Sequence, residues 1–156
     1  MEVKQVELLD NFDIELLLKQ IKVPLTQLCR IENLKMKPSK NSYYVINYDN
    51  QHWVCFYVKN NIAVYCDSYG EPPDSKILSF FRKHKLKYTI NYQQTQNLNA
   101  TSCGWFCIAF LYYMHSNRNN KNLYYVISNF NEKFNGDNQI KNDNKLQDYI
   151  KSIFKK

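Results

Sequence analysis

The fold of this chain is decided by residues 52–67, which run His52-Trp53-Val54-Cys55-Phe56-Tyr57-Val58-Lys59-Asn60-Asn61-Ile62-Ala63-Val64-Tyr65-Cys66-Asp67. Aromatic and β-branched residues dominate both halves, which is typical of strands, and Asn60-Asn61 suits a two-residue turn between them. With that turn, Val54 lies opposite Asp67, and His52 becomes a diagonal neighbour of Asp67 on the same face, about 7 Å away between backbones. A register slip of one residue would put the two side chains on opposite faces. The hairpin therefore predicts a His–Asp pair.

Further strands and helices are predicted on both sides of this hairpin. Strand-like runs occur at Tyr43–Tyr48 and Lys87–Tyr92. Pro24 either ends a first helix or starts a short second helix that runs to Ile31. The predicted helices cover Asp13–Ile21, Ser75–His84, Cys103–His115, Asn122–Phe134 and Asp143–Phe154. No repeat, linker or boundary interrupts this order, so residues 1–156 are expected to form a single domain.

Composition and charge narrow the class of protein. With 156 residues, of which 44% are hydrophobic and 15% aromatic, the chain can bury a core of its own, which excludes a disordered chain. Its net charge of +7 favours contact with polyanions such as nucleic acid. We expect neither secretion nor membrane insertion, because the sequence has no cationic leader and no apolar run of about 20 residues. The five cysteines contain no Cys-x-x-Cys pair, which favours free thiols in a reducing, intracellular setting.

Cys103 is the candidate nucleophile. It starts a strongly apolar helix, with Thr101 and Ser102 as cap candidates, so the positive end of the helix dipole would favour its thiolate. Gly104 follows it and leaves room for a substrate carbonyl to approach the backbone. The alternative is that Cys103 is a small buried apolar residue, as most cysteines are. Packing is the expected role of the other cysteines, which are Cys29 in an apolar helix, Cys55 and Cys66 in strands, and Cys107 one helical turn after Cys103.

His52 is the candidate general base. His115 lies on the same helix as Cys103, about 18 Å away, so it cannot reach the thiol. His84 stands in a basic turn with no adjoining carboxylate, and we expect it to be a solvated surface residue. His52 remains, and the hairpin supplies Asp67 to orient it. The alternative for Asp67 is that it belongs only to a turn that ends the strand.

A glutamine side chain is the candidate oxyanion donor. The polar stretch from Gln93 to Thr101 leads into the Cys103 helix. A side-chain amide in such a loop can point at the oxygen that becomes negatively charged during acyl transfer. Gln96 is one candidate, and the residue pattern leaves Gln93 and Gln94 open as alternatives.

The order His-Trp, Asp, Gln and Cys-Gly resembles that of the adenain-like cysteine proteases, the adenovirus maturation protease group. It is most like the version carried by Polinton/Maverick elements, virophages and related double-stranded DNA viruses. The matching blocks are His52-Trp53-Val54, the run Tyr-Cys-Asp-Ser-Tyr-Gly-Glu-Pro-Pro from Tyr65, and the run Gln-Asn-Leu-Asn-Ala-Thr-Ser-Cys-Gly-Trp-Phe-Cys from Gln96. The adenoviral enzymes share the Gln, the Asn three places on, and the Cys-Gly at the same offset, which selects Gln96 over the other glutamines. The resemblance spans roughly Asp10 to Met114.

This resemblance implies an α+β fold of the papain-like or adenain-like kind, with a mixed central β-sheet flanked by helices and a catalytic cleft between the sheet and the Cys103 helix. By similarity, Cys103 is the nucleophile, His52 is its base and Asp67 orients the base. Gln96 would then donate to the oxyanion, with the Cys103 amide as a second donor. Trp53 in this family lines a narrow channel for the substrate backbone, and a core position is its alternative.

The implied function is a maturation endopeptidase of a virus or mobile element, which cuts capsid and core precursor proteins through an acyl-enzyme at Gly-X or Gly-Gly sites. No cofactor or metal is expected for the chemistry. Adenoviral relatives are stimulated by DNA and by a viral peptide that can form a disulfide with the enzyme. The cysteine for that disulfide is missing near residues 84–87, whereas the charge of +7 leaves stimulation by DNA and non-specific DNA binding open. We expect a monomer in the virion and the infected host cell, with no membrane partner.

Two alternatives remain beside this function. The broader clan includes proteases of SUMO and other ubiquitin-like proteins, which carry Asp where adenoviral enzymes often carry Glu, so a deSUMOylase or deubiquitinase would fit Asp67. A non-catalytic, basic DNA-binding virion protein on the same fold would keep the positive charge without a reactive thiol. The segment after Met114 has no assigned catalytic role.

Overall fold

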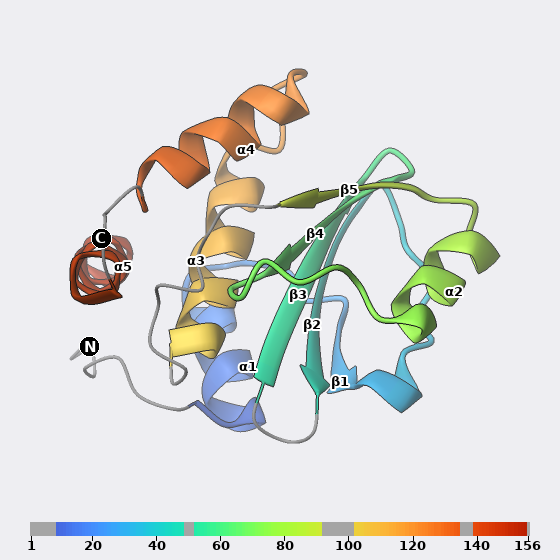
Figure 1. Cartoon of the computed structure of the whole chain (residues 1–156), viewed down its shortest axis with the longest axis horizontal. Helices are drawn as coiled ribbons and strands as arrows, with labels where there is room; N and C mark the ends of the chain where they lie inside the picture. Colours follow the sequence, from blue (N-terminus) through green and yellow to red (C-terminus); the bar gives the residue numbers. More distant parts are fainter. Residues whose placement is uncertain (1–8, 49–51, 92–101, 135–138, 156) are drawn as a thin grey trace.

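The computed structural model describes residues 9–48, 52–91, 102–134 and 139–155. Five strands in these ranges form one mixed sheet in the order β1-β2-β3-β4-β5, with helices on both of its faces (Figure 1). The strands are β1 (Gln27–Arg30), β2 (Asn41–Tyr48), β3 (His52–Lys59), β4 (Ile62–Asp67) and β5 (Lys87–Asn91). The predicted α+β class, with a mixed central sheet flanked by helices, is confirmed.

The central hairpin has the predicted register. β3 and β4 pair antiparallel, with Val54 opposite Asp67. The turn residues Asn60 and Asn61 have φ angles of 48° and 67°, and asparagine tolerates this left-handed region better than most residues do. Two positive φ angles in succession match the twist of the flanking strands. The turn therefore brings His52 and Asp67 to the same, open end of the hairpin.

The alternative of a short second helix from Pro24 to Ile31 is wrong. β1 occupies Gln27–Arg30 instead and pairs parallel with β2, so that Leu28 lies opposite Val45. A run of four residues is too short to show a helical or a strand period. Its partner strand is remote in the chain, so only the tertiary structure reveals the pairing. Cys29 accordingly lies in a strand and not in the helix where it was expected.

The other predicted elements are present, with ends shifted by a few residues. The helices are α1 (Asn11–Gln20), α2 (Ser75–Lys83), α3 (Cys103–Ser116), α4 (Leu123–Glu132) and α5 (Gln139–Phe154). Asp10 and Asp13 form a reciprocal capping box at the start of α1, and Asp74 caps α2 by accepting from the Lys76 backbone N–H. The largest shift is in α5, which begins at Gln139 and not at the predicted Asp143.

Side chains at alternate strand positions bury two separate cores. The face of β3 towards α1, α3, α4 and α5 carries Trp53, Cys55 and Tyr57. The face towards α2 carries Val54, Phe56 and Val58 (Figure 1). A sheet that is covered on both faces needs apolar residues at successive positions, and β3 is buried without a break from Trp53 to Val58. α3 is therefore held firmly against the sheet, which places its first residue.

The thiols follow the same arrangement. Cys55, Cys66 and Cys107 are each 1% exposed or less, so the packing role predicted for them is confirmed. All five cysteines are free thiols.

None of the helices within the described ranges is long and apolar enough to span a membrane.

Candidate active site

The three candidate catalytic residues meet at one end of the inner strands β3 and β4. β3 begins at His52, β4 ends at Asp67 and α3 begins at Cys103. The start of β3 lies beside the end of β4 because the two strands are antiparallel. α3 packs across the same sheet, and its first residue is close enough for the Trp53 backbone N–H to donate to Cys103 Sγ at 3.4 Å. The structure thus gathers three residues from separate parts of the chain.

Asp67 holds the His52 ring in place. Asp67 Oδ1 lies 2.8 Å from His52 Nε2 and also accepts the backbone N–H of Tyr69 at 2.9 Å. The Asp67 residue is 5% exposed, so its carboxylate is largely removed from water and acts on the imidazole at close range. The ring of Tyr69 stacks on His52 with 4.6 Å between centroids. A bond in the ring plane and a ring stacked on one face together fix the orientation of the imidazole.

The surroundings of His52 keep its ring protonated at neutral pH. Burial lowers the pKa of His52, but hydrogen bonding to Asp67 and then the proximity of Cys103 outweigh that effect and raise the pKa from 6.5 to about 9. A protonated imidazole beside a thiol favours the thiolate form of the cysteine. The three groups therefore suit a thiolate–imidazolium pair.

Asp67 occupies one ring nitrogen of His52 and leaves the other, Nδ1, for a second partner. Nδ1 is buried, and no hydrogen bond to it is present. The proximity of Cys103 contributes to the raised pKa of His52. Nδ1 is therefore the nitrogen that can exchange a proton with the thiol, and catalytic hydrogen bonds are often long without substrate and shorten when it binds.

Cys103 occupies the position from which a helix dipole acts on a thiol. It is the first residue of α3, and it is 1% exposed. The first backbone N–H groups of a helix have no partner within the helix, so their positive end favours a thiolate there. Ser102, one of the two cap candidates, stands at the N-cap position but makes no side-chain bond to the helix. Thr101, the other cap candidate, lies outside the described residues.

Gly104 and Trp53 pack directly against each other. A Cβ atom on Gly104 would lie 3.3 Å from Trp53 Cδ1 and 3.3 Å from Leu9 Cβ. The glycine was expected to leave room for substrate, whereas the space that its missing Cβ leaves is filled by these two residues. Trp53 is 2% exposed, and its Nε1 donates to the Leu9 carbonyl at 3.0 Å. The core position considered for Trp53 is thus present in the structure.

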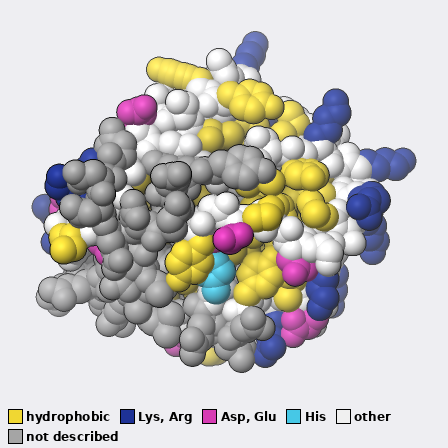
Figure 2. Space-filling model, viewed as in Figure 1, with side chains coloured by type: hydrophobic (Ala, Val, Ile, Leu, Met, Phe, Trp, Pro, Cys, Tyr) yellow, Lys and Arg dark blue, Asp and Glu magenta, His cyan; other side chains and the backbone are white. Residues whose placement is uncertain are grey.

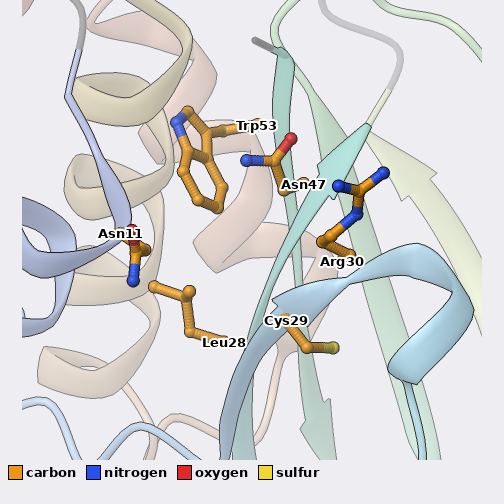
Figure 3. Close-up of a pocket in the computed structure, with 6 residues that line it drawn as sticks. All are labelled: Asn11, Leu28, Cys29, Arg30, Asn47 and Trp53. Atoms are coloured by element: carbon orange, nitrogen blue, oxygen red, sulfur yellow. The ribbon is translucent and has the colours of Figure 1, made fainter. Parts of the chain in front are cut away.

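Trp53 also lines a cavity of about 300 Å³ at the same edge of the sheet (Figure 3). The cavity lies between the start of α1, the end of β1 and the end of β2, and its other lining residues are Asn11, Leu28, Cys29, Arg30 and Asn47. Because its wall includes the residue whose N–H contacts the thiol, the cavity adjoins the candidate site. Sequence reasoning missed it, since half of its lining comes from the strand that was expected to be a helix.

The other two histidines have structural surroundings. His115 Nδ1 is 2.6 Å from the Tyr43 hydroxyl at the far end of α3. His84 ends α2 and packs on Phe80, with 4.5 Å between ring centroids, so it is half-buried and not the fully solvated residue that was expected. Gln96 lies outside the described residues. Within the described ranges, no three His, Cys, Asp or Glu side chains are grouped as a metal site would need.

The chain is similar in fold to a viral protease. It matches the ASFV pS273R protease with a TM-score of 0.65 and 14% sequence identity, over 94% of this chain and 68% of that one. The SUMO protease Ulp1 is less similar, with a TM-score of 0.46 and 13% sequence identity over 92% of this chain and 79% of that one. The C-terminal Ulp1 domain in complex with Smt3, the yeast orthologue of SUMO, has a TM-score of 0.45 and 16% sequence identity over 93% of this chain and 79% of that one. No protein-family model and no curated protein matches the sequence.

The structural class is therefore the papain-like protease fold represented by the pS273R protease, as predicted. At 14% identity this likeness concerns the fold and does not assign residues. The candidate site rests on its own geometry, which is the pairing of His52 with Asp67 beside Cys103.

Proposed function

We propose that this chain is a cysteine endopeptidase in which Cys103 is the nucleophile, His52 the general acid and base, and Asp67 the residue that orients His52. The observation that carries the proposal is the 2.8 Å contact between His52 Nε2 and Asp67 Oδ1, next to Trp53, whose backbone N–H donates to Cys103 Sγ. A histidine fixed at one nitrogen by a carboxylate, with a nucleophile at the other, is the arrangement that acyl transfer requires. The protease fold supports the same conclusion.

In the proposed resting state the Cys103 thiol proton has already passed to His52 Nδ1, which gives the thiolate–imidazolium pair. The thiolate then attacks the carbonyl carbon of the scissile amide, and the resulting oxyanion accepts hydrogen bonds from the Cys103 backbone N–H and from Gln96. His52 gives its proton to the amine nitrogen as the C–N bond breaks, which leaves a thioester on Cys103. His52 next removes a proton from water, the hydroxide cleaves the thioester, and the product acid leaves as the thiol is restored. No cofactor enters this sequence.

The natural substrates that we propose are capsid and core precursor proteins of a virus or mobile element, cut at Gly-X or Gly-Gly sites. The support is the resemblance of the three sequence blocks around His52, Asp67 and Cys103 to viral maturation proteases. Trp53 would form one wall of the substrate channel, because its backbone N–H contacts the thiol and the same residue lines the cavity. The enzyme would act as a monomer in the infected cell and the virion.

Co-expression with a capsid precursor of the same virus or element tests the proposal. We expect Cys103→Ala to abolish cleavage, whereas Cys29→Ala should cleave at the normal rate. Cys29 is the control because it is a half-buried free thiol of β1, with a pKa raised by burial and by Glu32 to about 11. Unchanged processing by the Cys103→Ala variant would refute the assignment of the nucleophile.

Incubation with fusions of SUMO and ubiquitin separates the viral function from the enzymatic alternative. The maturation protease should leave these fusions intact, and rapid release of the free modifier would favour a protease for ubiquitin-like proteins. Labelling of Cys103 by a peptide that carries a thiol-directed electrophile separates both from a non-catalytic DNA-binding protein. Only an activated thiol reacts quickly with such a probe.

The positive surface supports a proposal that DNA stimulates the enzyme without taking part in the chemistry. Lys and Arg side chains project from the surface around α2 (Figure 2), where the exposed residues are Lys76, Arg82, Lys83, Lys85 and Lys87. Contacts between such residues and phosphates weaken steeply as salt rises. We expect duplex DNA to raise kcat/KM at about 50 mM salt and to lose this effect at about 200 mM. An equal effect at both concentrations would contradict a contact with phosphates.

A further inference from the structure

Ser102 and Asp143 connect the C-terminal helix to the start of the catalytic helix. The Ser102 hydroxyl donates to Asp143 Oδ1 at 3.1 Å, across 41 residues of chain. Ser102 immediately precedes Cys103 and is completely buried. Figure 1 shows α5 end-on, beside the first turn of α3. Asp143, which belongs to the segment without an assigned role, therefore contacts the residue that precedes the candidate nucleophile.

The Ser102 hydroxyl does not cap α3 but bonds to Asp143 on α5. A serine at the N-cap of a helix normally accepts a hydrogen bond from a backbone N–H in the first turn. Ser102 has helical angles, φ −87° and ψ −8°, and makes no such bond. A buried hydroxyl without a partner is costly, and the Asp143 carboxylate supplies that partner. The hydroxyl thus fixes the helix start to another element and not to the helix itself.

α5 is anchored well enough to act as a fixed support. Its buried side chains Leu146, Ile150 and Ile153 are 0%, 1% and 4% exposed and belong to the core that contains α3. Asn142, next to Asp143, is 1% exposed. Because packing holds both helices, the bond between Ser102 and Asp143 sets the position of the α3 start relative to a rigid neighbour.

We propose that Asp143 is a positioning residue for the reaction, which acts through Ser102 to hold Cys103 facing His52. This inference rests on the proposed function of Cys103 and His52. The thiol must stay near both the Trp53 N–H and the imidazole, and these lie on the sheet, not on α3. A misplacement of about 1 Å at a reacting atom can reduce a rate about a hundredfold. The Ser102 bond opposes such a displacement at the residue next to the thiol.

The reaction of Cys103 with 2,2′-dipyridyl disulfide at about pH 4.5 measures this positioning without a substrate. An ordinary thiol with a pKa near 8.5 is about one part in 10⁴ thiolate at that pH, so only a thiolate paired with imidazolium reacts quickly. The thiolate attacks one sulfur of the reagent, a mixed disulfide forms on Cys103, and 2-thiopyridone leaves and is measured by absorbance. A loosened helix would expose the thiol, but it would not create a thiolate in acid.

Five variants separate positioning from stability. We expect Ser102→Ala and Asp143→Ala to lose about tenfold or more of the acidic reaction rate, and Asp143→Asn, which still accepts from Ser102, to stay within about threefold of the wild type. Ile153→Val removes one buried methylene from the same helix and should lower the midpoint of thermal unfolding without changing the rate. Asp148→Ala, an exposed change of the same charge on α5, should change neither. Peptide mapping assigns the label to Cys103.

Each outcome decides the inference. Wild-type rates in folded Ser102→Ala and Asp143→Ala would overturn it, and so would an equal loss in Ile153→Val, because the effect would then be one of general stability. If Asp143→Ala does not fold, Ser102→Ala decides, since it removes a single hydroxyl. If the wild type itself lacks the acidic reaction, the thiolate–imidazolium pair is absent and the proposed function fails first.

Discussion

Replacing Asp67 by Asn should move the alkaline limit of activity. The pKa of His52 is lowered by burial and raised to about 9 by Asp67 and Cys103 together. Asn removes the negative charge of Asp67, whereas burial and the proximity of Cys103 remain, so we expect the pKa of His52 to fall from about 9 towards 6.5. At pH 7.5 the imidazolium fraction is about 97% for a pKa of 9 and about 9% for a pKa of 6.5. The variant should therefore lose up to about tenfold in kcat/KM through the lost charge, and loss of ring orientation adds to this.

The pH dependence of kcat/KM for a Gly-Gly peptide between about pH 5 and 10 measures this shift. In the wild type the alkaline limb should fall near pH 9, and in Asp67→Asn it should move to lower pH, towards 6.5. Titration of the His52 ring by NMR gives the same pKa without turnover. Asp148→Asn, which makes the same chemical change at an exposed position, is the control and should keep the wild-type limb. A limb that stays near pH 9 in Asp67→Asn would show that the carboxylate is not what keeps His52 charged.

Three further predictions concern the residues that support the site. The pKa of His52 is raised in the folded chain, so its protonation contributes to stability, by an amount of order 3 kcal/mol. This contribution should be fully present below pH 6.5 and lost as the pH rises through about 9. Urea unfolding at pH 6 and pH 10 measures it, and equal stability of Asp67→Asn and the wild type at pH 6 would contradict it. Gly104→Ala puts a Cβ at 3.3 Å from Trp53 Cδ1, so overpacking of about 1–3 kcal/mol should outweigh the gain in helix propensity of about 1 kcal/mol and reduce kcat/KM, which thermal unfolding and peptide assays test. Asn61→Gly should raise the free energy of unfolding by a few tenths of a kcal/mol and Asn61→Ala should lower it by about 1 kcal/mol, since φ at this position is 67°; the opposite order in urea unfolding would argue against the turn.

The fold could be predicted wherever its cause was local. The hairpin register follows from a two-residue turn and a period of two, so Val54 could be set opposite Asp67 without any coordinates. β1 could not be predicted, because a four-residue strand has no readable period and its pairing with β2 is a long-range event. The cavity that β1 lines was missed for the same reason. Gln96 lies outside the described residues, so its role stays a prediction from the sequence.

The sequence by itself determined the hairpin, and with it the pairing of His52 and Asp67, because a turn and its strands are neighbours along the chain. It also determined that Cys103 begins a helix. Only the tertiary structure decided which nitrogen of His52 meets the carboxylate, that Trp53 and not open space adjoins Gly104, and that Asp143 lies against Ser102. These contacts join segments far apart in the chain, and their geometry depends on how α3 and α5 pack on the sheet, which no local pattern of residues specifies.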